Sequence, residues 1–178
     1  MGEIKSTLDL VMEKTKNLSL SDEEKQEHKN KEIAGRILGL LSKFQDKTIS
    51  LEGFHAQYRT LKQEYSLMET NDFLVKEICG QIQPGKDNQA MLDLLTEFKV
   101  PNVERLKSVL EEFQAVNGSA AEERCKVLKD RLAKTHFISG SAVVPNLGND
   151  DEWRHKAGEI KAEFEAKLKH ANNELLAG

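Results

Sequence analysis

Two short motifs could bind metal ions, because each places a carboxylate and an imidazole three residues apart on one helix. Glu52 and His55 form the first Glu-x-x-His pair, and Glu152 and His155 form the second. Di-metal four-helix proteins carry such pairs on two of their helices, with carboxylates bridging the ions. Here both pairs fall in the first helical turn, where carboxylates interact favourably with the helix dipole. We expect solvated side chains, with a helical-bundle metal protein as the alternative.

Other catalytic and nucleic-acid-binding motifs are weak. The sequence has no glycine-rich phosphate loop, and Ser139-Gly140-Ser141 lacks the preceding strand of a nucleophile turn. Residues 91–113 could form a helix-turn-helix, but its second helix begins Asn102-Val103-Glu104-Arg105 and the chain carries a net charge of -4. Phosphate binding requires a basic surface. We expect no enzyme, no cofactor and no nucleic-acid partner, and keep a nucleic-acid-associated regulator as a second alternative.

The segment 137–148 is the one stretch that does not resemble a helix, and it is apolar where a solvated loop should be polar. One hypothesis is a compact loop that folds over the end of the helical bundle as a lid. The other is an extended motif that binds a partner protein. Pro145 restricts Val144 to extended conformations under either hypothesis. We favour the lid. The candidate partner-binding residues of the second hypothesis are Ala142, Val143, Val144, Pro145 and Leu147.

The elements that position these residues are all predicted to be helices, six or seven in number. The chain divides into residues 1–47, with a first helix over 4–15 and a polar segment over 18–32, and a helical core over 48–178. Ser21 and Glu24 form a capping box that begins the second helix. Residues 22–32 carry no large apolar side chain, so we expect them to open easily. An apolar face begins at Ile33.

The strongest periodic signal lies in residues 51–82, after a cap at Ser50. Apolar residues alternate there in steps of three and four, which is the pattern of a coiled-coil seam. This pattern predicts one long helix, although Thr70-Asn71-Asp72 could begin a new one. The seam must be covered by another helix of this chain or by a second copy in a homodimer. Its positions are Leu51, Phe54, Tyr58, Leu61, Tyr65, Met68, Asp72, Val75, Cys79 and Ile82.

Local stop and start signals divide the second half of the chain into two helical hairpins. Asn102 is expected to cap a helix that ends at Asn117-Gly118, so that residues 86–117 form the first hairpin. Ser119 and Glu122 form a second capping box, and Asn149 to Glu152 begins the last helix. These signals place a C-terminal hairpin within 119–178, with helices over 119–136 and 149–176.

The chain is expected to be cytoplasmic. It has no apolar run near the ~20 residues that a bilayer-spanning helix needs, and its two cysteines, Cys79 and Cys125, lie far apart in the sequence. Residues 1–6 match the myristoylation pattern, but a single acyl chain without a following basic segment anchors poorly. We therefore expect no membrane partner.

The opening MGEIKSTLDLVMEKT is similar to the start of small helical bacterial proteins of uncharacterised function. This resemblance implies a helical start and attaches no activity. Taken together, the sequence predicts a non-catalytic cytoplasmic interaction or scaffolding protein that self-associates through the 51–82 seam. It does not identify the partner.

Overall fold

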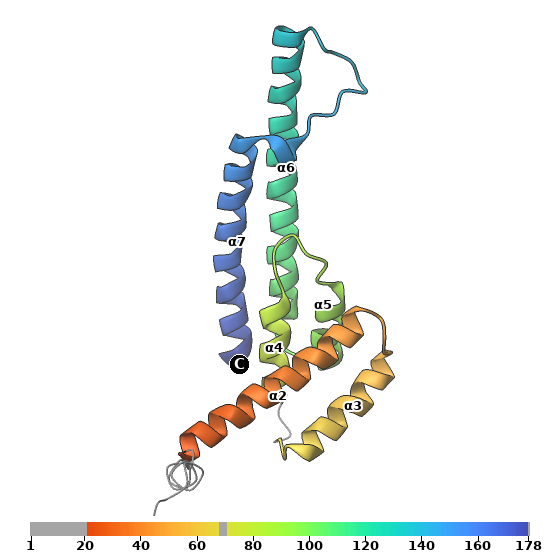
Figure 1. Ribbon diagram of the computed structural model, residues 1–178, viewed down its shortest axis with the longest axis vertical. Coiled ribbons are helices and arrows are strands. Elements are labelled where there is room, and N and C mark those ends of the chain that lie inside the picture. The colour runs from red at the N-terminus through yellow and green to blue at the C-terminus, as the bar shows by residue number, and fades with distance from the viewer. Residues whose placement is uncertain (1–20, 68–70, 178) are drawn as a thin grey trace, which may run out of the picture.

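The computed structural model describes residues 21–67 and 71–177, and all regular structure in these residues is helical (Figure 1). The predicted all-α fold is confirmed. The helix expected over 4–15, the myristoylation pattern and the resemblance at the amino terminus lie outside the described residues. The helices are α2 (Asp22–Gln45), α3 (Leu51–Glu64), α4 (Asp72–Gln81), α5 (Gln89–Glu97), α6 (Val103–His136), the short η1 (Leu147–Asn149) and α7 (Asp151–Ala177).

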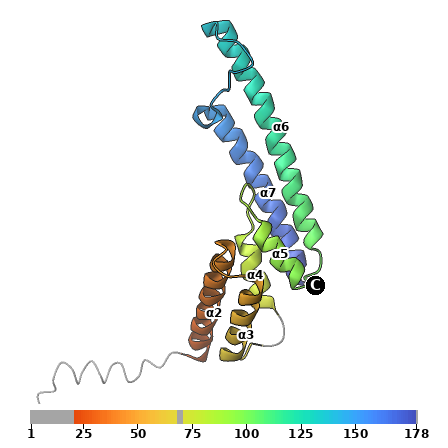
Figure 2. The ribbon, with the colours of Figure 1, turned by 90° about the vertical axis from the view of Figure 1, so that its right-hand side faces the viewer.

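The molecule has two parts, which we call the base and the stalk. The base consists of α2 to α5, and the stalk consists of α6 and α7, which run side by side away from the base (Figures 1 and 2). The main hydrophobic core fills the base and includes the beginning of α6 and the end of α7. Its largest fully buried side chains include Phe54, Ile37, Ile78, Leu94 and Leu106.

The start of α2 is the predicted capping box. The Ser21 backbone N–H donates to the Glu24 carboxylate at 2.7 Å, and the Glu24 N–H donates to the Ser21 hydroxyl at 3.1 Å. Residues 22–29, 31 and 32 are exposed, and burial begins at Ile33. The polar segment is therefore a solvated extension of a helix whose second half packs on the core.

Residues 51–82 form two helices rather than one long helix, and the alternative start within residues 70–72 is confirmed, because α4 begins at Asp72 after Asn71. Tyr65 ends α3, and Ser66 adopts a left-handed backbone with φ of 51°. Both halves of the seam then pack on α2, so one covering helix serves them both. Phe54, Tyr58 and Val75 are buried in this way, whereas Leu51 is exposed. The cover comes from the same chain.

The turn between α4 and α5 is built around one buried polar side chain, Asn88. Its amide nitrogen donates to the carbonyl oxygens of Gln83 and Lys86 at 2.9 and 3.0 Å. Its amide oxygen accepts from the Gln83 N–H at 3.1 Å. Gly85 adopts a φ of 80° in the same turn, against the ring of Phe113. Asn88 thus supplies hydrogen bonds that the loop backbone would otherwise lack.

The predicted boundary at residues 117–119 was wrong. α6 continues without a break from Val103 to His136, so the C-terminal hairpin begins at residue 103 rather than 119. Val109, Phe113 and Ala120 pack against Ile160 and Phe164 of α7 on both sides of the expected break. This packing outweighs the local signals at Gly118 and Ser119. Asn102 precedes α6, but it has a φ of 62° and makes no side-chain capping bond.

Candidate interaction surface at the end of the stalk

The four candidate metal ligands do not converge. Glu52 and His55 lie on α3 in the base, and Glu152 and His155 lie at the start of α7, in the stalk (Figure 1). His55 lies 3.3 Å from the Glu97 carboxylate, and His155 lies 3.7 Å from that of Glu159. Within the described residues, no three His, Cys, Asp or Glu side chains are grouped to hold an ion.

The second helix of the helix-turn-helix candidate starts in a packed environment. Val103 is buried, and the Arg105 guanidinium pairs with the Glu174 carboxylate of α7 at 2.6 Å. Base readout requires side chains at the start of a recognition helix to be free for the groove. At the start of α6, Val103 instead packs in the core of the base, and Arg105 joins α6 to α7.

The number of buried apolar side chains in the stalk decreases with distance from the base. From residue 114 to residue 159 no side chain is buried. The start of α7 is held to α6 by a cluster of charged groups instead. The Arg124 guanidinium donates two hydrogen bonds of 2.8 Å to Asp150 and one of 2.5 Å to Glu152. We call Arg124, Asp150 and Glu152 the clamp.

Asp150 has two roles in the clamp. Its carboxylate binds Arg124, and it also accepts the Trp153 backbone N–H at 2.7 Å, which caps α7. The expected cap at Asn149 is therefore displaced by one residue. The Arg124 guanidinium holds the pKa of the Asp150 carboxyl below its ordinary value, with a further contribution from the Trp153 N–H. A bidentate arginine–carboxylate pair fixes geometry as well as charge.

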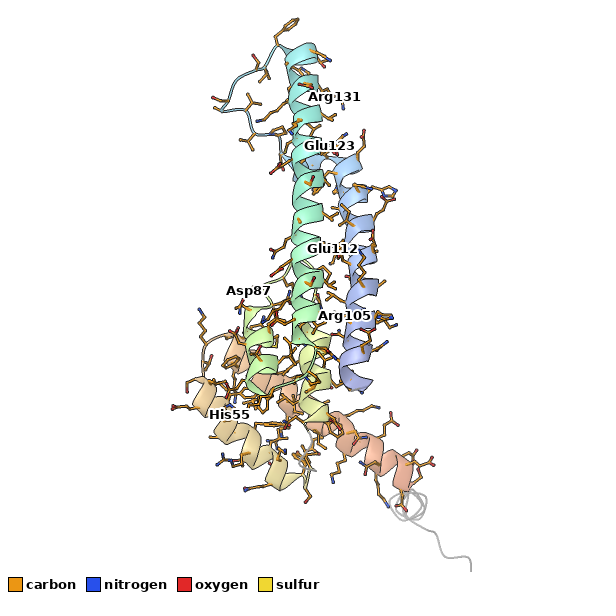
Figure 3. The ribbon with its side chains drawn as sticks, turned by 180° about the vertical axis from the view of Figure 1, so that it is seen from behind. His55, Asp87, Arg105, Glu112, Glu123 and Arg131 are labelled. Carbon is orange, nitrogen blue, oxygen red and sulfur yellow. The ribbon has the colours of Figure 1, made fainter. Side chains whose placement is uncertain are left out.

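Beyond the clamp, α6 continues without α7 beside it. We call residues 125–136 the distal segment and residues 137–146 the tip loop, which arcs away from the end of α6 and returns to η1 (Figure 1). Arg131 lies on the distal segment, and Glu123 lies just below it on the same helix (Figure 3).

The tip loop is not a lid, so the favoured hypothesis for this segment was wrong. Phe137 is 90% exposed and Val144 is 82% exposed, while Ile138 is about half exposed. Of the five candidate partner-binding residues, Ala142 and Val144 are exposed, and Val143, Pro145 and Leu147 are half-buried. The loop has no bundle end to cover, because α6 extends past the start of α7.

Phe137 is exposed on an unfavourable backbone. It ends α6 in the left-handed conformation, with φ of 56° and ψ of 27°. This conformation costs a residue with a Cβ about 1–2 kcal/mol, and glycine is the usual residue at such a helix end. The exposed ring and the left-handed backbone both make phenylalanine unfavourable at position 137. The stability of the fold therefore does not explain why this residue is there.

The end of the stalk also differs in charge from the rest of the chain. Residues 137–149 contain no charged side chain, although 31% of the chain is charged. The distal segment contains Lys126, Lys129, Arg131 and Lys134 against the single carboxylate of Asp130. Residues 125–149 therefore carry +3, and since the chain carries -4, the remainder carries -7. Sequence reasoning missed this contrast, which a count of charges along the chain would have found.

Comparisons with known proteins find no relative of this chain. No protein-family model, no curated protein and no solved structure matches the chain. None of the helices in the described residues has the length and apolar character needed to span a membrane.

Proposed function

We propose that this protein is a non-catalytic interaction protein that binds its partner through the tip loop at the end of the stalk. The observation that supports the proposal is the exposure of Phe137 at the far end of a projecting helix and of Val144 in the loop that follows it. An exposed apolar group that stability does not explain is typical of a binding surface. The base then serves as a folded scaffold that holds the stalk.

The proposal takes the protein to be cytoplasmic. Two unpaired cysteines, Cys79 and Cys125, are compatible with a reducing compartment. Burial raises the pKa of the Cys79 thiol to about 11, which leaves it protonated and poorly reactive at neutral pH. Self-association through residues 51–82 loses its main support, because the buried seam residues pack within one chain. A homodimer would have to use another surface.

Photo-cross-linking in the cells that make the protein tests the proposal. A photoreactive residue replaces Phe137 or Val144 in one set of variants and Val116, an exposed valine lower on α6, in the control. We expect defined adducts, with a protein or with lipid, from positions 137 and 144 and a much weaker yield from position 116. Equal yields at all three positions, or none at the tip, would contradict an interaction through the tip loop.

A further inference from the structure

We propose that the end of the stalk binds the surface of an anionic lipid membrane, with Phe137, Ile138 and Val144 entering the interface. This inference rests on the proposed function and names the partner of the same surface. The sequence-based expectation of no membrane partner considered only spanning helices and acyl anchors. A peripheral contact at the tip requires neither.

The first step of the argument is charge. Lys126, Lys129 and Lys134 are exposed on the distal segment, beside a loop with no charge of its own. Each basic residue near an anionic bilayer raises partitioning onto the membrane about fivefold. The remainder of the chain, which includes the base and the rest of the stalk, carries -7, so these parts are repelled while the end of the stalk is attracted. This asymmetry orients the molecule with its stalk toward the membrane.

The second step is the apolar group. Nucleic acids offer anionic charge and bases on which aromatic rings stack, but a bilayer interface also accepts aliphatic side chains a few ångströms below the headgroups. Phe137 is almost completely exposed, and Val144 is exposed on the returning part of the tip loop. Long lysine side chains can place their ammonium groups at the headgroup level while such residues insert. The combination therefore favours lipid over nucleic acid.

The third step is shape. The tip loop lies at the end of a single helix and projects outward (Figures 1 and 2). A stable protein interface usually buries at least about 1,200 Å² in total, which requires a partner that wraps around such a projection. A membrane is a continuous fluid surface and needs no matching cavity. The convex end of the stalk therefore fits a membrane better than a preformed protein groove.

Vesicle binding by the full chain tests this inference. Purified protein is co-sedimented with vesicles of phosphatidylcholine alone, and with vesicles that also contain about a third phosphatidylserine. We expect binding only to the second type, weakening as salt is raised because the charges are screened. Folded wild-type protein that fails to bind the anionic vesicles would overturn the inference. A protein adduct at position 137 would then leave the proposed function standing.

Two pairs of variants locate the contact. Phe137→Ser with Val144→Ser removes apolar groups at the tip, and Val116→Ser with Leu51→Ser removes exposed apolar groups elsewhere. Lys129→Glu with Lys134→Glu reverses charge at the tip, and Lys29→Glu with Lys169→Glu makes the same change in net charge elsewhere. We expect the tip charge variant to lose at least about 25-fold in partitioning, roughly fivefold for each lysine. Equal losses in the tip and control variants would reject the tip as the contact.

Insertion has its own signature. Trp153, the single tryptophan, lies at the start of α7, below the tip. A Phe137→Trp variant adds a second indole at the tip, and brominated lipids quench an indole that enters the interface. We expect quenching of the variant well above the wild-type background. Vesicle binding without added quenching would show adsorption by charge alone and would overturn the apolar part of the inference.

Discussion

At the scale of single residues, Phe137 is a position at which the residue type is unfavourable for the stability of the fold. Its backbone lies in the left-handed region, and its ring is solvated. We predict that Phe137→Gly raises the free energy of unfolding by about 1 kcal/mol, because glycine adopts this conformation without a Cβ penalty. Urea denaturation provides the measurement. A destabilised glycine variant would mean that the aromatic ring packs on the protein in solution.

The lowered pKa of Asp150 leads to a prediction about how stability depends on pH. Its pKa is lowered in the folded state by Arg124, so its charge stabilises the fold above the ordinary carboxyl pKa near 4. That contribution disappears as the pH falls through the lower folded value. We predict that wild type has a higher urea midpoint than Asp150→Asn at neutral pH and that the difference shrinks below about pH 4.

The asparagine at position 150 can still cap α7, so this substitution isolates the charge. Asp151→Asn is the matched control, because Asp151 is exposed and pairs only with Arg154 of the next turn. We expect a smaller difference for the control at every pH. A difference between wild type and Asp150→Asn that grows on acidification would have the wrong sign and would exclude the clamp as its source.

At the scale of helices, the sequence correctly predicted those features that depend on contacts between residues close in the chain. The capping box of Ser21 and Glu24 was predicted correctly, because both partners lie within one turn. For residues 51–82 the sequence left one helix or two open, because the seam spacing continues past Tyr65 while Asn71-Asp72 offers a new start. The structure has two helices, both packed on α2. The clamp was missed, since Arg124 and Asp150 are 26 residues apart and neither belongs to a motif.

The continuity of α6 is the clearest case in which packing outweighs a local signal, and it can be tested at Gly118. This glycine lies inside the helix, with open space around the position of a Cβ. We predict that Gly118→Ala raises the free energy of unfolding by about 0.5–1 kcal/mol, because alanine is the better helix former. Thermal or urea unfolding measures the change.

Gly85 supplies the control for this substitution. Its φ of 80° is unfavourable for any residue with a Cβ, so Gly85→Ala should lower stability by about 1 kcal/mol. If Gly118 instead ended a helix in the left-handed conformation, both alanine variants would be destabilised. Opposite signs at the two positions therefore establish that α6 is one helix.

The tip loop makes a second prediction at this scale. Val144 is 82% exposed, so Val144→Ser should change the free energy of unfolding by less than about 0.5 kcal/mol. Leu94→Ala, in the fully buried part of the core, should cost about 2–5 kcal/mol. A large loss for Val144→Ser would restore the lid hypothesis. If the free energy of unfolding is unchanged, a loss of binding by the tip variants cannot be attributed to unfolding.

At the scale of the whole molecule, stability is unequal along the long axis. The core lies in the base and the first turns of the stalk, and the far half of the stalk is joined by the clamp rather than by buried side chains. Regions with few buried apolar contacts open at low cost in free energy. The surface that we propose for binding therefore lies in a part of the described chain that can adjust readily to a partner.

The same reasoning predicts the order of cleavage by trypsin. Lys25, Lys29 and Lys31 are exposed on a part of α2 that can unravel without disturbing the core. Arg59 and Lys76 are also exposed, but α3 and α4 are anchored by Phe54, Leu74 and Ile78, and a protease needs several residues to unfold. Cuts within 22–32 should therefore precede any cut within 51–82 in a time course followed by mass spectrometry. Early cleavage at Arg59 or Lys76, with residues 22–32 intact, would show that the base is not the stable part of the molecule.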